Sequence, residues 1–400
     1  MTAERLPTLP TARTCPYAPR TEHVELRDQE SVAKVALSES SEAWVVTRHA
    51  DIRAVLADTR FSSERAHPSF PALGQKRSGA ESVLPPVLIS MDPPVHGQAR
   101  RSVLGEFTVK RINRLRPRIQ EIVDDHIDAM LAGPRPVDLV RALSLPVPSL
   151  VISELLGVPY GDHDFFQARS ATIVSYNAPP DDRRQALVEL VTYMGDLIRT
   201  KEEEPADDLL SRQIAQQREQ GGVRHADLVA MAFLLLTAGH ETTANMISLS
   251  TLRLSQDHEA REALRREPGK TLGAVEELLR YFTIAEQGIG RVATEDIEVG
   301  GKVIPAGDGV FPLTHTANRD PEVFADPDVF DIDRGARNHL AFGFGPHQCL
   351  GQNLARLELQ IVIDTLLRRI PDIRPAVPVD ELPFKKDSIV YGIHEFPVTW

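Results

Sequence analysis

Apolar residues recur at helical spacing over most of the stretch from residue 97 to residue 282. A period near 3.6 residues is typical of helices that bury one face. The pattern predicts helices over 97–108, 111–132, 144–156, 163–175, 183–203, 207–219, 225–257, 259–266 and 271–282. The middle of the chain is therefore predicted to be almost entirely α-helical.

Strand patterns occur only outside this helical stretch. Residues 42–48 predict a short strand, and residues 296–307 predict a hairpin with a Gly-Gly turn. Residues 309–314 predict a further strand, and the C-terminal segment predicts a hairpin around Gly392. The predicted fold is mainly α, a large helical domain with small peripheral β-sheets.

Residues 61–95 form a long loop with eight prolines or glycines. Loops of this length inside a compact domain are usually functional or disordered. Chain length alone predicts two or three domains, but no linker-like tract marks a boundary. We therefore expect an N-terminal arm over 1–20, rich in Pro and Thr, and a single domain over 21–400.

Composition and charge exclude several classes of function. The net charge of −12 and the pI near 5.6 argue against general nucleic-acid binding, which requires a basic surface. The two cysteines, Cys15 and Cys349, form no disulfide framework and predict a reducing cytoplasm. The N-terminus lacks the apolar core of a secretory signal, and the run 229–236 is too short for a membrane span.

The segment 228–254 is apolar almost all round, which predicts a buried central helix. Its middle nevertheless contains the sequence "GHETT" at 239–243. A buried carboxylate is unfavourable by several kcal/mol unless it is paired or solvated. One interpretation is a kinked core helix with a satisfied carboxylate. The other is a helix that opens locally against a ligand.

One face of this segment favours the ligand interpretation. Leu234 or Leu235, Ala238, Thr242 and Asn245 share that face because they follow helical spacing. The face narrows to alanine next to a glycine, as expected if something flat and bulky lay against it.

Cys349 lies in a glycine-rich loop directly before an apolar-periodic helix. A structural thiol would normally lie among aliphatic residues, and a zinc ligand would need companions that the sequence does not contain. A nucleophile would need a base, which no spacing indicates. A thiolate ligand of haem iron remains plausible because backbone N–H groups and the following helix would stabilise its charge.

The sequence "FGFGPHQCLG" at 342–351 resembles the haem-thiolate signature of the cytochrome P450 family. The sequence "AGHETT" at 238–243 is similar to the oxygen-activating motif of that family, and "EELLR" at 276–280 to its Glu-x-x-Arg pair. The segment 317–334 is similar to the one that precedes the haem loop. The resemblance is strongest to soluble bacterial cytochromes P450 of the actinobacterial type that act on macrolides and xenobiotics.

The resemblance implies a cytochrome P450 fold with haem b buried between the long central helix and the Cys loop, and with O2 as co-substrate. Cys349 would be the axial ligand of the iron, and Glu241 and Thr242 would be the acid–alcohol pair that relays protons. The two haem propionates need cationic hydrogen-bond donors. The further cofactor-binding residues implied are His96, Arg100, Arg291, His347, Ala238, Gly239, Phe342, Gly343 and Gly351.

The resemblance also implies structural and substrate-binding roles. Glu277, Arg280 and Arg334 would form a buried triad that braces the haem loop. Residues 175–182 suggest a lid that opens for the substrate. The substrate-binding residues implied are Val87, Ile89, Phe233, Leu234, Ile284, Glu286 and Ile393.

One basic stretch interrupts this acidic chain. Between Arg100 and Arg118 lie seven Lys or Arg residues and a single acid, Glu106. A solvated helix face is one interpretation of this stretch. The resemblance implies another, the docking of an acidic ferredoxin that an NAD(P)H-dependent reductase supplies with electrons.

The function implied is that of a monooxygenase that inserts one oxygen atom from O2 into a hydrophobic small molecule, usually by hydroxylation. The substrate would be a secondary metabolite, a macrolide or polyketide, a steroid-like compound or a xenobiotic. The alternatives are a haem-thiolate binding or sensor protein without turnover, and a peroxide-driven oxygenase. Glu241 and Thr242 favour the monooxygenase, because neither alternative requires a proton relay. A cytoplasmic monomer without nucleic-acid or membrane partners is expected.

Overall fold

The computed structural model describes residues 6–10, 13, 15–38, 41–71, 86–175, 177–285, 289–386 and 388–400. The chain divides into two compact units. The first, called the sheet unit below, comprises Met1–Ala80, Ile89–Gly97 and Glu276–Cys349. The second, called the helical unit, comprises Glu81–Leu88, Gln98–Val275 and Leu350–Trp400. In the described ranges, no helix combines the length and the apolar character needed to cross a membrane.

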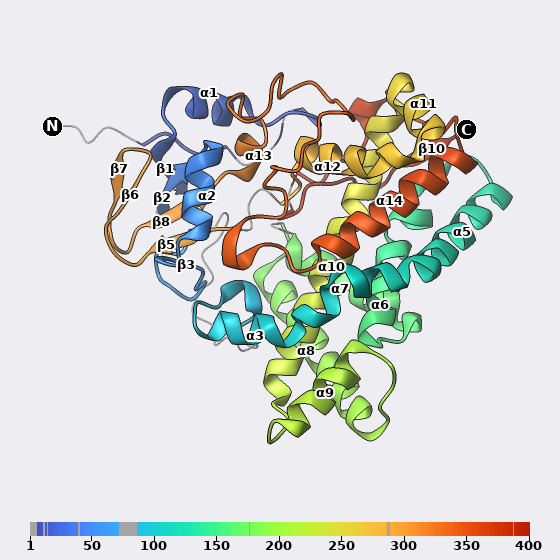
Figure 1. Ribbon diagram of the computed structural model, residues 1–400, viewed down its shortest axis with the longest axis horizontal. Helices are drawn as coiled ribbons and strands as arrows, with labels where there is room; N and C mark the ends of the chain where they lie inside the picture. The colour runs from blue at the N-terminus through green and yellow to red at the C-terminus, as the bar shows by residue number, and fades with distance from the viewer. Residues whose placement is uncertain are drawn as a thin grey trace. The chain divides into compact units, whose positions relative to one another are not determined.

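The sheet unit contains a five-stranded sheet in the order β1-β2-β8-β5-β3, whose strands lie side by side in Figure 1. The strands are β1 (Val32–Ser38), β2 (Ser41–Val46), β3 (Phe61–Ser62), β5 (Arg291–Ala293) and β8 (Gly309–Pro312). β1 and β2 are antiparallel, whereas β2 and β8 are parallel and place Val45 opposite Phe311. Both of these side chains are buried, so the sheet carries much of the core of this unit.

The predicted hairpin is confirmed as β6 (Ile297–Val299) and β7 (Lys302–Ile304). Its turn residues Gly300 and Gly301 have φ angles of 54° and 77°. A two-residue turn of this kind requires positive φ at both positions, which glycine adopts without a steric penalty. The strands predicted over 42–48 and 309–314 correspond to β2 and β8.

The elements of the sheet unit that were not predicted include β1 and the helix α1 (Thr21–Gln29). Both are rich in small or charged residues, so neither shows a clear apolar period. The unit also contains α2 (His49–Ala57), α13 (Thr314–Ala317) and the 3-10 turn η7 (Gly345–His347). The described part of the N-terminal arm is tied to this unit, because Thr8 bridges to Ala36 of β1.

The helical unit is built around α10 (His225–Ser255), which packs against α6, α8 and α14. The helices of this unit are α4 (Val109–Ile112), α5 (Arg116–Ala132), α6 (Pro146–Leu156), α7 (His163–Val174), α8 (Pro180–Glu203), α9 (Leu209–Glu219), α11 (His258–Arg266) and α14 (Gln352–Arg369). Two more helices, α3 (Val95–Leu104) and α12 (Thr271–Phe282), include residues of both units. The predicted mainly helical architecture is confirmed.

Some predicted boundaries were wrong. The helix predicted over 111–132 is interrupted by a 3-10 turn, after which α5 begins with Pro117 in its first turn. The hairpin predicted around Gly392 is reduced to one bridge between Phe384 and Ile393. The strand that follows, β10 (Pro397–Thr399), instead pairs with the short strands β4 (Val137–Asp138) and β9 (Arg374–Pro375).

The predicted triad residues meet in the sheet unit. The Glu277 carboxylate accepts hydrogen bonds from Nε and Nη2 of Arg280, both at 2.7 Å, and from Nε of Arg334 at 3.2 Å. Arg280 Nη1 donates to the carbonyls of Asn318 and Pro327, each at 2.7 Å. The side chains of Glu277 and Arg280 are 0% exposed, so each depends on the other for neutralisation.

The turn η7 lies against the end of α2, and this contact requires glycine. Gly345 has a φ of 71°, and a Cβ atom there would lie 2.5 Å from the carbonyl oxygen of Leu56. Gly343 has a similar φ of 68°, but the space around its Cα is open. The two glycines therefore share a backbone constraint, and only Gly345 also has a packing constraint.

We expect Glu277→Ala to destabilise the protein by about 3–5 kcal/mol, because it leaves the buried Arg280 cation without its carboxylate. Equilibrium denaturation in urea measures the change. Glu295→Ala is the matched control, since Glu295 pairs with Arg60 at the surface and should contribute at most about 1 kcal/mol. Equal effects of the two substitutions would contradict a stabilising role for the triad.

We expect Gly345→Ala to cost about 2–5 kcal/mol, the sum of left-handed backbone strain and a clash with the Leu56 carbonyl. Gly343→Ala should cost only the strain, about 1–2 kcal/mol. The free energies of unfolding of the two variants, compared with the unsubstituted protein, test this difference. A Gly343 variant as unstable as the Gly345 variant would show that the contact with α2 is unimportant.

Candidate functional site

Cys349 is the last residue of the sheet unit and is partly buried. Its N–H donates to the carbonyl of Phe342 at 2.8 Å. This hydrogen bond joins the two ends of the loop 342–349, which contains η7. The helix α14 starts three residues later, with Gly351 at its N-cap. A thiolate ahead of a long helix benefits from the positive end of the helix dipole.

The zinc interpretation of Cys349 receives no support. In the part of the chain that the structure describes, no group of three or more His, Cys, Asp or Glu residues is arranged to hold a metal ion. The loop offers a single thiol surrounded by glycine backbone, and that arrangement suits a ligand whose remaining coordination positions come from a cofactor.

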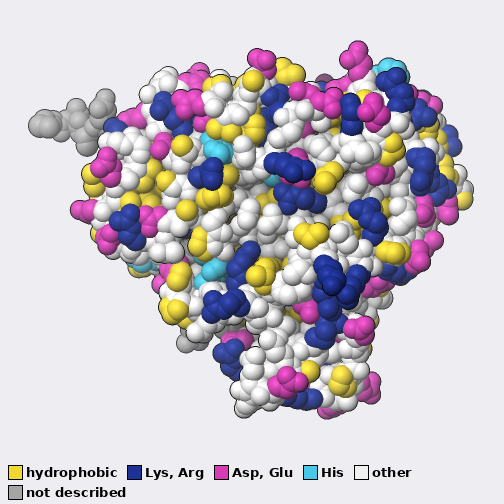
Figure 2. Space-filling model, viewed as in Figure 1, with side chains coloured by type: hydrophobic (Ala, Val, Ile, Leu, Met, Phe, Trp, Pro, Cys, Tyr) yellow, Lys and Arg dark blue, Asp and Glu magenta, His cyan; other side chains and the backbone are white. Residues whose placement is uncertain are grey.

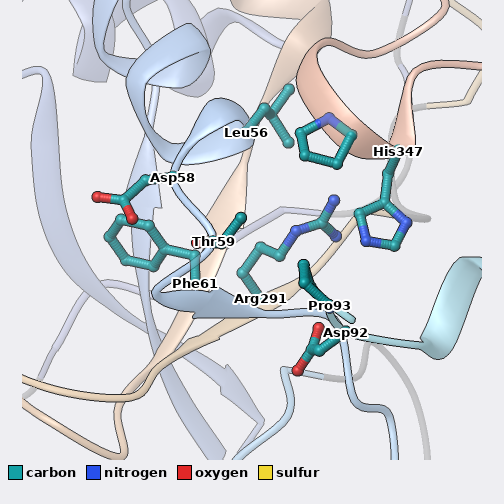
Figure 3. A pocket seen from close by; sticks show the side chains of 9 residues that line it. Leu56, Asp58, Thr59, Phe61, Asp92, Pro93, Arg291 and His347 are labelled. Atoms are coloured by element: carbon teal, nitrogen blue, oxygen red, sulfur yellow. The ribbon is translucent and has the colours of Figure 1, made fainter. Parts of the chain in front are cut away.

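A small polar pocket opens in the sheet unit beside this loop (Figure 3). Arg291 of β5 and His347 of η7 line it together with Asp92, and the Arg291 guanidinium points toward the His347 ring. Asp92 accepts a hydrogen bond from the N–H of Ser63 at 2.8 Å. It also accepts one from the hydroxyl of Ser62.

Arg291 is a buried cation, and the Asp92 carboxylate acts on it electrostatically without forming an ion pair with it. Its Nη1 donates to the carbonyls of Gly290 at 2.8 Å and Ile289 at 3.3 Å, and no described carboxylate forms an ion pair with it. Burial, with the Arg65 cation as a further cause, lowers the pKa of Arg291 to about 10, so it remains charged at neutral pH. A carboxylate of a bound group would neutralise it, which fits a haem propionate.

His96 lies beside His347, one of the residues that line the pocket. Its ring stacks on that of His347, with 4.0 Å between the ring centroids, and it is only 2% exposed. His347 Nε2 lies 3.0 Å from the hydroxyl of Ser63. Arg100 follows His96 by one turn on α3. Three of the four predicted propionate ligands, His96, Arg291 and His347, are thus gathered within the sheet unit.

The predicted face of α10 is the least covered part of that helix after its exposed first turn. Ala238 is exposed and Leu234, Gly239 and Thr242 are half-buried, whereas most of α10 is buried. An apolar stripe left open on a core helix fits a flat apolar ligand such as a haem ring. Asn245 is an exception to the prediction, because its side chain is 2% exposed.

The ligand interpretation predicted that α10 opens locally, but the helix does not open. It is continuous from His225 to Ser255, and the Thr242 hydroxyl donates to the Ala238 carbonyl at 2.8 Å. A Cβ at Gly239 would lie 2.9 Å from Cγ1 of Ile152 in α6. Gly239 therefore permits close packing of two helices, a reason that the sequence pattern did not indicate.

Glu241 is buried and forms an ion pair with Lys385 of the C-terminal segment, and its side chain is 8% exposed. Its Oε1 accepts from Lys385 Nζ and also from Asn245 Nδ2 at 3.5 Å. Burial raises the pKa of Glu241, but the Lys385 cation and nearby His240 outweigh burial and hold that pKa below its ordinary value. Glu241 and Thr242 therefore each bond to other groups and not to one another.

The predicted substrate-binding residues fall into two groups. Ile89 is exposed, and Val87 and Leu234 are half-buried, so these offer surface to a ligand. The side chains of the remaining described ones are covered by protein, which favours a packing role for Phe233, Ile284 and Ile393. Glu286 lies outside the described residues.

The predicted basic stretch is partly neutralised. Arg111 pairs with Glu106 at 2.8 Å, and Arg118 pairs with Glu154 at 2.6 Å. Lys110 and Arg114 are exposed and form no ion pair with a described carboxylate. Figure 2 shows Lys and Arg side chains gathered beside hydrophobic ones on the face that carries α3 and α5 in Figure 1.

The sequence pattern missed three residues of these sites: Ser63, Asp92 and Lys385. Ser63 and Asp92 lie in the long loop 61–95, where no periodicity indicates a contact. Lys385 lies 144 positions from Glu241 and occurs in an ordinary polar stretch. Only the three-dimensional arrangement relates these residues to the motifs.

Comparisons with known proteins agree with this geometry. The family model described as "Cytochrome P450" matches residues 180–371. Pentalenic acid synthase of Streptomyces avermitilis is 49% identical over 391 residues, which is 98% of this chain and 96% of that protein.

Two solved structures are also similar along their whole length. Cytochrome P450 MoxA from Nonomuraea recticatena has 58% identity and a TM-score of 0.91, with 98% of each chain covered. The mycinamicin VIII C21 methyl hydroxylase MycCI from Micromonospora griseorubida, solved with mycinamicin VIII bound, has 40% identity and a TM-score of 0.93. The match covers 99% of this chain and all of that one. The chain therefore belongs to the cytochrome P450 family and is a monooxygenase that uses haem b and O2.

Proposed function

We propose that Cys349 is the axial ligand of the haem and that His96, Arg100, Arg291 and His347 hold its propionates. The observation that carries this proposal is the buried Arg291 cation, which faces a pocket and has no carboxylate partner among the described residues. When bound, a haem with a thiolate ligand supplies the activation of O2 for insertion of one oxygen atom into the substrate. In this proposal Phe342 packs near the thiol and limits access of water to it.

Glu241 and Thr242 supply protons in this proposal. The Thr242 hydroxyl keeps its hydrogen on the Ala238 carbonyl until an acceptor above the helix face competes for it. Glu241 takes up a proton at its carboxylate and passes it toward Thr242 Oγ1, since a buried site receives protons only through ordered hydroxyls, carboxyls and water. The exposed Ala238 leaves room for small molecules next to this pair.

The substrate that we propose is a hydrophobic secondary metabolite, with a macrolide as the first candidate. One relative is named for its product pentalenic acid, and one similar structure contains a bound macrolide substrate, mycinamicin VIII. The half-buried Val87 and Leu234 and the exposed Ile89 provide apolar surface for such a molecule. No observation favours the sensor or the peroxide-driven alternative.

Bacterial cytochromes P450 of this type take their electrons from a ferredoxin and its reductase. We propose that the ferredoxin docks on a surface formed by Lys110, Arg114, Leu104 and Val109. The first two residues are exposed cations, and the last two are apolar side chains that are 46% and 59% exposed. Apolar residues ringed by cations suit an acidic partner. A monomeric, cytoplasmic enzyme is part of the same proposal.

The first experiment is the difference spectrum of the dithionite-reduced protein with and without carbon monoxide. We expect the strongly red-shifted Soret band that is typical of thiolate ligation, because Cys349 donates its charge to the iron. Cys349→Ser should lose this band, while Cys15→Ser, the only other thiol change available, should retain it. A thiolate-type band that survives Cys349→Ser would show that the assigned ligand is wrong.

The docking surface predicts a loss of electrostatic steering when its charges are removed. The double variant Lys110→Gln/Arg114→Gln should reduce the rate constant for reduction by ferredoxin about tenfold at low salt, and should weaken its salt dependence. Stopped-flow mixing over a range of salt concentrations measures both. The variant Arg141→Gln/Arg224→Gln removes the same charge from other exposed sites and should behave as the unsubstituted protein. Matching results for the two double variants would rule out this surface.

A further inference from the structure

Lys385 is held against α10 by the backbone of the C-terminal segment. Its N–H donates to the Gly392 carbonyl at 2.8 Å, and the neighbouring residue Phe384 bridges to Ile393. Gly392 lies directly on α10, since a Cβ at this position would meet the Asn245 amide at 2.0 Å. The position of Lys385 is therefore fixed by contacts with the helix that carries Glu241.

The side-chain contact is as well defined as the backbone. The Lys385 side chain is 13% exposed and that of Glu241 is 8% exposed, so the pair is largely out of water. Lys385 and Asn245 both donate to Oε1 of Glu241, and Oε2 has no hydrogen-bond partner among the described residues. The pair therefore fixes one carboxylate oxygen and leaves the other available.

We propose that Lys385 is a positioning residue for the oxygenase reaction, which holds Glu241 as an oriented carboxylate with Oε2 ready to accept a proton. This inference rests on the proposed role of Glu241. A neutral Glu241 in the resting enzyme would have no capacity to take up the next proton. An unanchored one would have no fixed direction for passing it on.

The charged groups around Glu241 explain why Lys385 has this effect. Among the described residues, Lys385 and His240 are the titratable groups that act on Glu241, and Asn245 adds a neutral donor. Burial lowers the pKa of His240, and Lys385 has a larger lowering effect on the pKa of Glu241 than His240 does. Without Lys385, the dominant effect on Glu241 would be burial, which raises the pKa of a carboxyl group.

The variant Lys385→Met tests the proposal because it keeps the length and the apolar stem of the side chain and removes its charge. Infrared difference spectra of the resting holoenzyme during pH titration report the protonated carboxyl of Glu241, independently of turnover. We expect the variant to show this band near neutral pH, and the band should disappear in Lys385→Met/Glu241→Gln. The unsubstituted enzyme and the control Lys386→Met, an exposed neighbour, should lack the band at the same pH.

A second measurement follows the fraction of NAD(P)H electrons that reach product as a function of pH. Glu241 should lose its ionised form in Lys385→Met as pH falls through the raised pKa, so the acid limb should move upward by about one to three pH units. Lys385→Arg keeps the cation and should restore the original profile. It also serves as the folded reference if Lys385→Met loses haem.

The outcomes distinguish a failure of the proposed role of Glu241 from a failure of the proposed role of Lys385. If Glu241→Gln leaves product formation unchanged, the proposed role of Glu241 fails and the role of Lys385 fails with it. If Glu241→Gln lowers product formation while Lys385→Met matches the unsubstituted enzyme in both measurements, only the role of Lys385 is overturned. A new carboxyl band and a shifted pH profile, both restored by Lys385→Arg, support the proposal.

Discussion

Charge that is removed from water must be neutralised by a partner or by a proton, and the buried ionisable groups of this protein follow three different routes. Glu277 and Arg280 neutralise each other inside the sheet unit. Glu358 of α14 is fully buried, and burial raises its pKa to about 8, so a proton neutralises it at neutral pH. Arg291 forms no ion pair with a carboxylate in the described part of the chain, and its pKa is too high for it to lose its charge at neutral pH. That remaining cation is the strongest physical argument for an anionic cofactor.

The residues of the motifs and the partners within the triad were predictable from the sequence, whereas several other partners were not. The spacing around Cys349 and the Glu-x-x-Arg pair are local patterns, which can be recognised in the sequence without knowledge of the structure. Lys385 comes from a segment far from Glu241 in the sequence and forms an ion pair with it. Arg111 forms an ion pair with Glu106. Such contacts depend on how the chain folds back, and no periodicity encodes them.

The same distinction applies to the fold. Long apolar-periodic segments such as α10 and the Gly-Gly hairpin were predicted because their patterns have a single structural solution. β1 was missed since its alternation is blurred by alanine and serine, although the completed sheet buries it. Gly239 shows a subtler limit, because its position was anticipated while the neighbour that requires it, Ile152, belongs to another helix.

The contact between Gly345 and the end of α2 links two parts of the chain that are remote in sequence. The loop that carries the thiol packs against the Leu56 carbonyl. A cysteine loop transferred alone into another protein would lose its packing contact with the end of α2. Recombination between related enzymes should therefore keep residues 49–57 and 342–351 from the same parent.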